Sequence, residues 1–207
     1  MFTVFIVDDD AGVLKALSRL LRARGYEVQS YTSPREFLAQ HDATVPGCAV
    51  LDVAMPGLDG LELQHALTAA QGTHRPVIFI TGKGDIPTSV RAMKAGAIDF
   101  LTKPVSDKDL LAAIARAEEQ DARARQAHAE LAEIQAKITT LTPREREVLT
   151  HVVAGRLNKQ IAGDLGTVEK TIKVHRGRMM AKLGVRSVAE LVRLADRAGI
   201  KPARGGQ

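Results

Sequence analysis

The stretch that decides the fold is Val4-Phe5-Ile6-Val7-Asp8-Asp9-Asp10, in which four apolar residues are followed at once by three carboxylates. Three later apolar runs also end in a polar or charged side chain: residues 48–51 in Asp52, residues 77–80 in Thr81, and residues 97–102 in Lys103. Short apolar runs between helical patterns are typical of buried parallel strands. Ligand sites gather at the carboxyl ends of such strands, so we expect these side chains to meet in one crevice.

The first part of the chain alternates predicted strands with predicted helices. We expect strands at residues 3–7, 27–31, 48–51, 77–80 and 97–101, and helices near residues 11–24, 34–40, 60–70, 86–95 and 107–118. Five such units predict a doubly wound, five-stranded parallel sheet, which is a flavodoxin-like α/β fold.

The rest of the chain reads as helical. Residues 119–140 are rich in Ala, Glu and Arg without Gly or Pro, so we expect them to extend the preceding helix as a linker. From residue 141 to about 200 the pattern predicts an all-α domain of four short helices. Its helix signals are a capping box at Thr142–Glu145, a cap at Asn158 and a second capping box at Ser187–Glu190. Residues 158–183 have the spacing of a helix-turn-helix.

Charge divides the chain in the same way. The net charge is +5, yet residues 1–117 carry 12 Lys and Arg against 13 Asp and Glu, whereas residues 141–207 carry 14 against 6. A basic module of this kind predicts a polyanionic partner. Cys48 is the single cysteine, which excludes an intrachain disulfide and fits a reducing cytosol. No apolar run approaches the roughly 20 residues of a membrane span, so we expect a cytoplasmic protein with no membrane partner.

The crevice residues suggest a reaction. Asp8, Asp9 and Asp52 would repel one another if all were ionised, and a cation such as Mg²⁺, or Mn²⁺ in its place, would relieve this. A metal-backed carboxylate that faces the Lys103 ammonium and the Thr81 hydroxyl suits phosphoryl transfer, with Asp52 as the acceptor. Each residue alone is more often structural, as a helix cap or a turn, but four at successive strand ends favour a site.

The second helix of the helix-turn-helix has two distinct faces. Ile172, Met179 and Leu183 share one face at helical spacing and are expected to be core. The opposite face carries side chains that can neutralise phosphates or contact bases in the major groove: Lys170, Lys173, Val174 and Gly177, with Arg178 at its margin. Gly177 costs the helix about 1 kcal/mol relative to Ala, which suggests a close backbone approach to a partner.

The stretches FIVDDD, VLDVAMPGLDGLEL and FITGKGDIPTSVRAMKAGAIDFLTKP resemble the receiver domain of bacterial two-component response regulators of the FixJ type, over residues 1–118. The resemblance implies that Asp52 accepts a phosphoryl group from a sensor histidine kinase. It also implies that Asp9, Asp52 and the backbone carbonyl of Ala54 bind Mg²⁺, with Asp8 assisting through water.

By the same resemblance, Thr81 and Lys103 contact the phosphoryl group, and Phe100 is a switch residue that swings inward when Thr81 moves. The Lys103–Pro104 peptide bond is expected to be cis. Ala54 departs from many receivers, which carry a polar or basic side chain there.

The stretches LTPREREVL and GRLNKQIAGDLGTVEKTIKVHRGRMMAKLGVRSVAELV resemble the four-helix LuxR/FixJ-type DNA-binding domain, over residues 141–198. The resemblance implies that Lys173, Val174 and Gly177 face bases of double-stranded promoter DNA. It places Asn158, Lys159, Thr171, His175 and Arg176 against the phosphate backbone. Val168 stands where the family usually has a capping Ser.

Together these observations predict a transcription regulator that is controlled by phosphorylation, forms a homodimer when phosphorylated, and is not an enzyme with turnover. Two alternatives remain at this point. A Mg²⁺-dependent phosphohydrolase would share Asp52 and Lys103, although such enzymes generally place a second acid where Ala54 stands. A phospho-relay protein could use its basic end to bind something other than DNA.

Overall fold

The computed structural model describes residues 1–69, 75–82 and 86–203. It separates into two compact units, of which the first ends at Arg125 and the second begins at Gln126. Within the described residues, no helix is both long enough and apolar enough to cross a membrane.

The first unit is built on a five-stranded parallel sheet in the order β2-β1-β3-β4-β5. The strands are β1 (Thr3–Val7), β2 (Glu27–Tyr31), β3 (Gly47–Asp52), β4 (Val77–Thr81) and β5 (Asp99–Thr102), and the helices are α1 (Ala11–Ala23), α2 (Pro34–Gln40), α3 (Gly60–Ala69), α4 (Ile86–Lys94) and α5 (Asp107–Thr139). The doubly wound fold predicted from the sequence is therefore confirmed.

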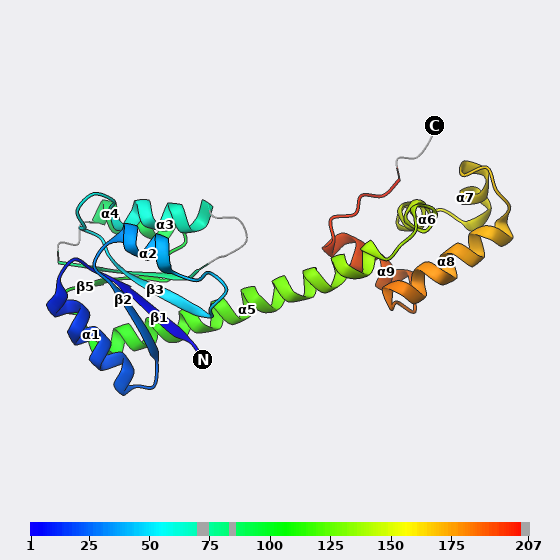
Figure 1. The fold of residues 1–207 in the computed structure, drawn as a ribbon. Coiled ribbons are helices and arrows are strands. Elements are labelled where there is room, and N and C mark those ends of the chain that lie inside the picture. The colour runs from blue at the N-terminus through cyan, green and yellow to red at the C-terminus, as the bar shows by residue number, and fades with distance from the viewer. Residues whose placement is uncertain (70–74, 83–85, 204–207) are drawn as a thin grey trace. The chain divides into compact units, whose positions relative to one another are not determined.

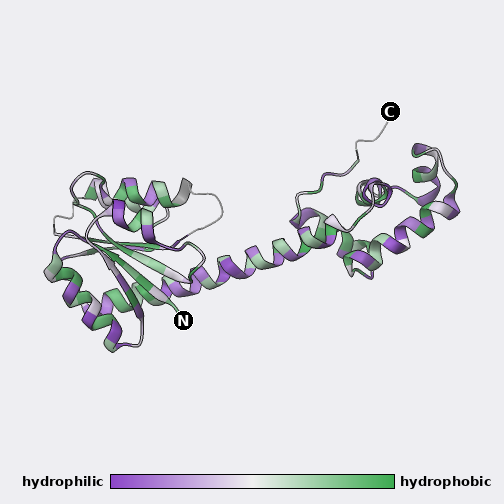
Figure 2. Ribbon diagram, in the orientation of Figure 1, coloured by the Kyte–Doolittle hydropathy of each residue, from purple (hydrophilic) through white to green (hydrophobic). Residues whose placement is uncertain are grey.

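Helices cover both faces of this sheet (Figure 1). Helices α1 and α5 lie on one face, where Leu17 and Ile114 pack against strand residues such as Ile6. Helices α2, α3 and α4 lie on the other face, where Phe37 and Leu63 belong to a second apolar cluster. The inner strands β1, β3 and β4 consequently run between two apolar layers, and Figure 2 shows mainly hydrophobic residues along them.

The fifth strand begins and ends later than the sequence suggested. We expected a strand over residues 97–101, but β5 spans Asp99–Thr102. Gly96 adopts a positive φ of 88°, and the Ala97 N–H returns to the Ala92 carbonyl at 3.1 Å. These are the features of a glycine-terminated helix end, so Ala97 completes α4 before the strand can begin.

Up to residue 203, the second unit contains the end of α5 and four further helices: α6 (Pro143–Val153), α7 (Asn158–Asp164), α8 (Glu169–Leu183) and α9 (Val188–Arg197). Its core includes Val148, Ile161 and Leu191, together with the predicted core residues of α8, Ile172, Met179 and Leu183. The continuous helix α5 confirms that residues 119–139 extend the preceding helix.

Of the three predicted helix caps in this unit, one is confirmed. Thr142 and Glu145 form the full capping box. Asn158 does not cap α7: it is the first helical residue, after Leu157, and its side-chain oxygen accepts a hydrogen bond from Arg176.

The third cap is half formed. Ser187 accepts a hydrogen bond from the Glu190 N–H, as predicted. The Glu190 carboxylate, however, accepts from the Arg186 N–H. The second hydrogen bond of the predicted capping box, from the Ser187 N–H to the Glu190 carboxylate, is therefore wrong, because the carboxylate binds the Arg186 N–H instead.

Candidate functional site

Three of the predicted crevice residues meet directly. Asp8 follows β1 and is fully buried, and Asp52 is the last residue of β3 and only 4% exposed. Lys103 follows β5, and its Nζ lies 2.7 Å from Asp8 Oδ2 and 2.9 Å from Asp52 Oδ1. Because β1 and β3 are adjacent parallel strands, their carboxyl ends bring the two carboxylates together.

The crevice is electrostatically unbalanced. Burial raises the pKa of Asp8 above its ordinary value, although the hydrogen bond from Lys103 opposes this shift. Burial also acts to lower the pKa of Lys103, but its hydrogen bonds to Asp8 and Asp52 outweigh burial, so the pKa rises and the ammonium stays charged. When both acids are ionised, one ammonium does not neutralise two carboxylates, so the crevice has a net negative charge that a further cation can offset.

Asp52 is held by its own loop. Its Oδ2 accepts a hydrogen bond of 2.9 Å from the N–H of Ala54, an exposed residue just beyond the strand. Ala54 thus binds one oxygen of the carboxylate, Oδ2, and Lys103 contacts the other, Oδ1. The backbone N–H of Ala54 therefore lies next to the proposed acceptor.

Thr81 lies on β4, the strand next to β3, and Phe100 lies one strand further out, on β5. Thr81 ends β4 and is 1% exposed, and its carbonyl accepts a 2.7 Å hydrogen bond from the Lys103 N–H. Phe100 is half-buried in β5, with its ring centroid 6.2 Å from that of Phe79. The Lys103–Pro104 peptide bond is cis, as the resemblance implied.

The other two acids after β1 behave differently. Asp9 is exposed. Asp10 caps α1 by accepting hydrogen bonds from the N–H groups of Gly12 and Val13, so the structural explanation holds for this residue. In the part of the chain that the structure describes, no three His, Cys, Asp or Glu side chains are grouped closely enough to hold a metal ion.

The donor chemistry nevertheless fits magnesium. The groups that converge at the crevice are the carboxylates of Asp8 and Asp52, with the backbone of Ala54 beside them. Mg²⁺ usually binds one or two carboxylates in a protein and keeps several waters. The full ligand set of Asp8, Asp9, Asp52 and the Ala54 carbonyl stays a prediction.

The predicted DNA-contacting residues lie on α7 and α8. Six of them are exposed: Lys159, Lys170, Lys173, Val174, Gly177 and Arg178. Four are half-buried: Asn158, Thr171, His175 and Arg176. Helix α8 thus has a buried face toward the core of its unit and an accessible basic face.

Two contacts within this basic face were missed from the sequence. Lys173 Nζ lies 3.3 Å from Glu169 Oε1, and Arg176 Nη1 donates to Asn158 Oδ1 at 3.0 Å. The first pair has the i, i+4 spacing that a helical sequence can reveal. The second pair joins two helices and leaves no local signal. Val168, at the start of α8, provides no side-chain cap, as its apolar side chain implied.

Comparison with known families agrees with both halves of the chain. Residues 4–115 match the response regulator receiver domain, and residues 139–195 match the bacterial regulatory proteins of the luxR family. One match therefore lies in each compact unit.

Full-length relatives share this arrangement. Nodulation protein W of Bradyrhizobium diazoefficiens is 46% identical over 95% of this chain and 86% of that protein. The transcriptional regulatory protein FixJ of the same species is 41% identical over 95% and 96% of the two chains. Among solved structures, the response regulator StyR is 47% identical with a TM-score of 0.83, covering 95% of this chain and 98% of StyR.

These matches favour a regulator over the phosphohydrolase and over the relay protein without a DNA output, because the relatives include named transcriptional regulators and the second unit is a DNA-binding domain. The chain belongs to the response regulators that join a receiver domain to a LuxR-family DNA-binding domain, as FixJ does.

Proposed function

We propose that Asp52 is the phosphoacceptor through which a sensor histidine kinase controls DNA binding. The observation that carries the proposal is the contact of the Lys103 ammonium with both Asp8 and Asp52. In the reaction, an Asp52 oxygen attacks the phosphorus of a phosphohistidine on the kinase. A P–O bond forms as the P–N bond breaks, and the imidazole nitrogen leaves with the electron pair.

The residues around Asp52 each have a role in this step. Lys103 offsets charge on the transferred oxygens once its contact with Asp52 passes to the phosphoryl group. The Thr81 hydroxyl, at the end of the neighbouring strand, binds another of these oxygens. Phe100 then moves inward as Thr81 shifts, which alters the surface formed by α4, β5 and the start of α5.

Asp8, Asp9, Asp52 and the Ala54 carbonyl would hold Mg²⁺, or Mn²⁺ in its place. The metal supplies positive charge that lowers the cost of bringing a phosphoryl group to an acidic crevice. Among the chain's own groups, Asp8 keeps Lys103 oriented through the 2.7 Å contact. This orientation is what presents the ammonium to Asp52.

For the DNA half, we infer that α8 enters the major groove of double-stranded promoter DNA. Lys173, Val174 and Gly177 would face bases. Contacts to the phosphate backbone would come from Asn158, Lys159, Thr171, His175 and Arg176, with Lys170 and Arg178 at the margins. The accessible basic face of α8 supports this assignment, and a cytoplasmic location follows from the same DNA partner.

Phosphorylation would act by pairing two chains into a homodimer. Helix α4 exposes three apolar side chains, Ile86 at 80%, Val90 at 44% and Met93 at 46%. Exposed apolar surface of this kind is typical of a contact that is covered in one state of a protein. A ligand or modification shifts such an equilibrium only by its differential affinity for the two states.

DNA selection from random sequence, with and without beryllofluoride and Mg²⁺, tests this function. We expect the phosphoryl mimic to tighten binding to the selected site and the Asp52→Asn variant to lose that response. Glu27→Gln, an exposed acid on the edge strand β2 and outside the surface of α4, β5 and α5, is the control and should respond normally. Mass spectrometry after acetyl phosphate treatment should locate the modification at Asp52, and modification elsewhere would refute the proposal.

A further inference from the structure

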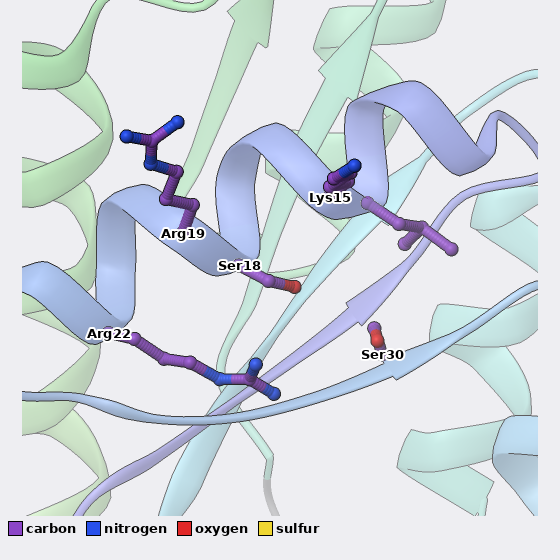
Figure 3. Close-up of a pocket in the computed structure, with 6 residues that line it drawn as sticks. Lys15, Ser18, Arg19, Arg22 and Ser30 are labelled. Atoms are coloured by element: carbon purple, nitrogen blue, oxygen red, sulfur yellow. The ribbon is translucent and has the colours of Figure 1, made fainter.

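A pocket with a basic rim lies outside the crevice, between α1 and the edge strand β2. It has a volume of about 550 Å³ and is lined by Leu14, Lys15, Ser18, Arg19, Arg22 and Ser30. Figure 3 shows the basic residues and Ser18 along one helix, with Ser30 on the neighbouring strand. None of these residues has a part in the phosphorylation or DNA-binding roles proposed above.

The positive charge of this pocket is not balanced. Lys15, Arg19 and Arg22 are exposed, and none of them makes an ion pair with any residue that the structure describes. Arg22 Nη2 donates one hydrogen bond of 3.2 Å, to the Val28 carbonyl of β2, which turns its guanidinium toward the strand. Three basic residues therefore line one hollow without a carboxylate partner from this part of the protein.

Ser18 gives an independent indication of an occupant. The residue is only 7% exposed, and its Oγ is buried without a hydrogen-bond partner in the described part of the chain. Most buried hydroxyls in proteins are paired, because an unpaired one loses its hydration without compensation. An acceptor atom bound in the pocket would supply the missing partner.

The strand side of the pocket is also open. Strand β2 is at the edge of the sheet and pairs with β1 alone among the described strands. Ser30 lies on this strand and is exposed, so it offers a hydroxyl on the side opposite Ser18. Donors on both walls are suited to a ligand with several acceptor oxygens.

We propose that this pocket binds a small polyanion that carries phosphate or carboxylate groups. Guanidinium groups match the paired oxygens of both groups, and Lys15 adds a compact charge. The hydroxyls of Ser18 and Ser30 donate to the remaining oxygens. The ligand binds independently of Asp52 and Mg²⁺, because no crevice residue lines the pocket.

Titration of the full chain with pyrophosphate, and separately with citrate, tests this proposal by amide NMR without Mg²⁺. Chloride at matched ionic strength is the reference. We expect the Ser18 and Ser30 resonances to shift saturably with at least one of the two anions. The better of them identifies the group, phosphate or carboxylate, that the pocket prefers. Reading these local resonances separates the pocket from anions bound at the basic DNA-binding unit.

Variants make the test specific. Arg19→Gln should weaken the apparent affinity at these resonances by about fivefold, the loss of one charge-assisted contact. Arg24→Gln, an exposed arginine nearby that does not line the pocket, should leave affinity unchanged. Ser18→Ala should raise the thermal midpoint without anion yet weaken anion binding. Shifts that do not saturate, or that are equal in Arg19→Gln and the unaltered protein, would overturn the proposal.

Discussion

Lys103 Nζ lies 2.7 Å from Oδ2 of Asp8, a carboxylate with no exposed surface. The crevice therefore keeps an ionisable group where water cannot reach it, and only one ammonium offsets two acids. Charges held this way generally cost stability, and they persist where a ligand or a reaction needs them. This cost can be measured.

Replacing Asp8 by Asn should stabilise the metal-free protein. Burial raises the pKa of Asp8 above the ordinary 3.8, so its favourable contribution is present below 3.8 and is lost as the pH rises through the folded value. At neutral pH the buried, ionised carboxylate lowers the free energy of unfolding. The asparagine amide has a similar shape and no charge, so it avoids this cost. We expect urea unfolding to show a gain of about 1 kcal/mol at pH 7, net of the lost contact with Lys103.

Asp9→Asn is the control for this variant, because Asp9 is exposed and its charge is hydrated. Both variants should lose part of the stabilisation that Mg²⁺ gives the unaltered protein. Asp8→Asn would contradict the account if it unfolded more easily at pH 7 and still responded fully to Mg²⁺.

In the DNA-binding unit, Glu145 should make stability depend on acid. Its carboxylate is 2.6 Å from Lys182 Nζ, and this hydrogen bond is the main reason that the pKa of Glu145 lies below its ordinary 4.5. Its contribution is therefore present above pH 4.5 and is lost as the pH falls through the lowered value. Glu145→Gln should cost about 2 kcal/mol at pH 7, with less cost at low pH.

Urea unfolding between pH 7 and pH 3 checks this expectation. Glu147→Gln is the matched control, since Glu147 is half-exposed and pairs with Arg144 on the surface. That variant should change stability by less than about 1 kcal/mol. If both variants lowered the free energy of unfolding by the same amount at every pH, the Lys182 contact would not stabilise the unit more than a surface ion pair does.

Gly177→Ala should separate stability from DNA binding. A Cβ atom at this position of α8 would meet nothing within 4 Å in the protein. Alanine should therefore raise the free energy of unfolding by about 1 kcal/mol. If the helix backbone approaches DNA closely here, affinity should fall in the same variant, as a gel-shift titration would show. Unchanged affinity would place Gly177 away from the bases.

Lys173→Ala and Lys159→Ala should weaken DNA binding in different ways. If Lys173 reads a base, its variant should lose about 1–3 kcal/mol on the specific site and discriminate less between sequences. If Lys159 contacts only phosphate, its variant should weaken all sequences alike and reduce the salt slope by about 1. Identical behaviour of the two variants would reject the assignment of Lys173 to a base.

The structure also indicates that Glu169 restrains Lys173. The two side chains pair at 3.3 Å in the absence of DNA. Glu169→Gln should release the lysine and remove a negative charge from the interface, so binding should tighten on both specific and random DNA. Equal affinities of Glu169→Gln and the unaltered protein, on both kinds of DNA, would show that the pair does not compete with DNA.

Much of the fold was readable from the sequence because it rests on periodicity. Apolar runs such as residues 4–7 located the strands, and the order of strands and helices gave the doubly wound sheet. The meeting of Asp8, Asp52 and Lys103 followed from a general property of parallel sheets. The helical character of residues 119–139 followed from composition.

Other features depended on contacts between distant residues and could not be predicted. The predicted start of β5 was wrong because Gly96 ends α4 in a turn, in which the Ala97 N–H binds the Ala92 carbonyl. Asn158 was expected to cap a helix, but Arg176 from α8 takes its side chain. The pairing of Glu145 with Lys182 likewise joins two helices that are far apart in sequence.

The last turns of α5 have a practical consequence for dissecting this protein. Glu130 pairs with Arg197 of α9, and Ile138 packs on the apolar cluster of the second unit. A truncated clone that starts at residue 141 would therefore leave Arg197 without its acid and open a gap in that cluster. Cloning from Gln126 retains both contacts, and it should give the better-behaved fragment for crystallising this unit with an operator.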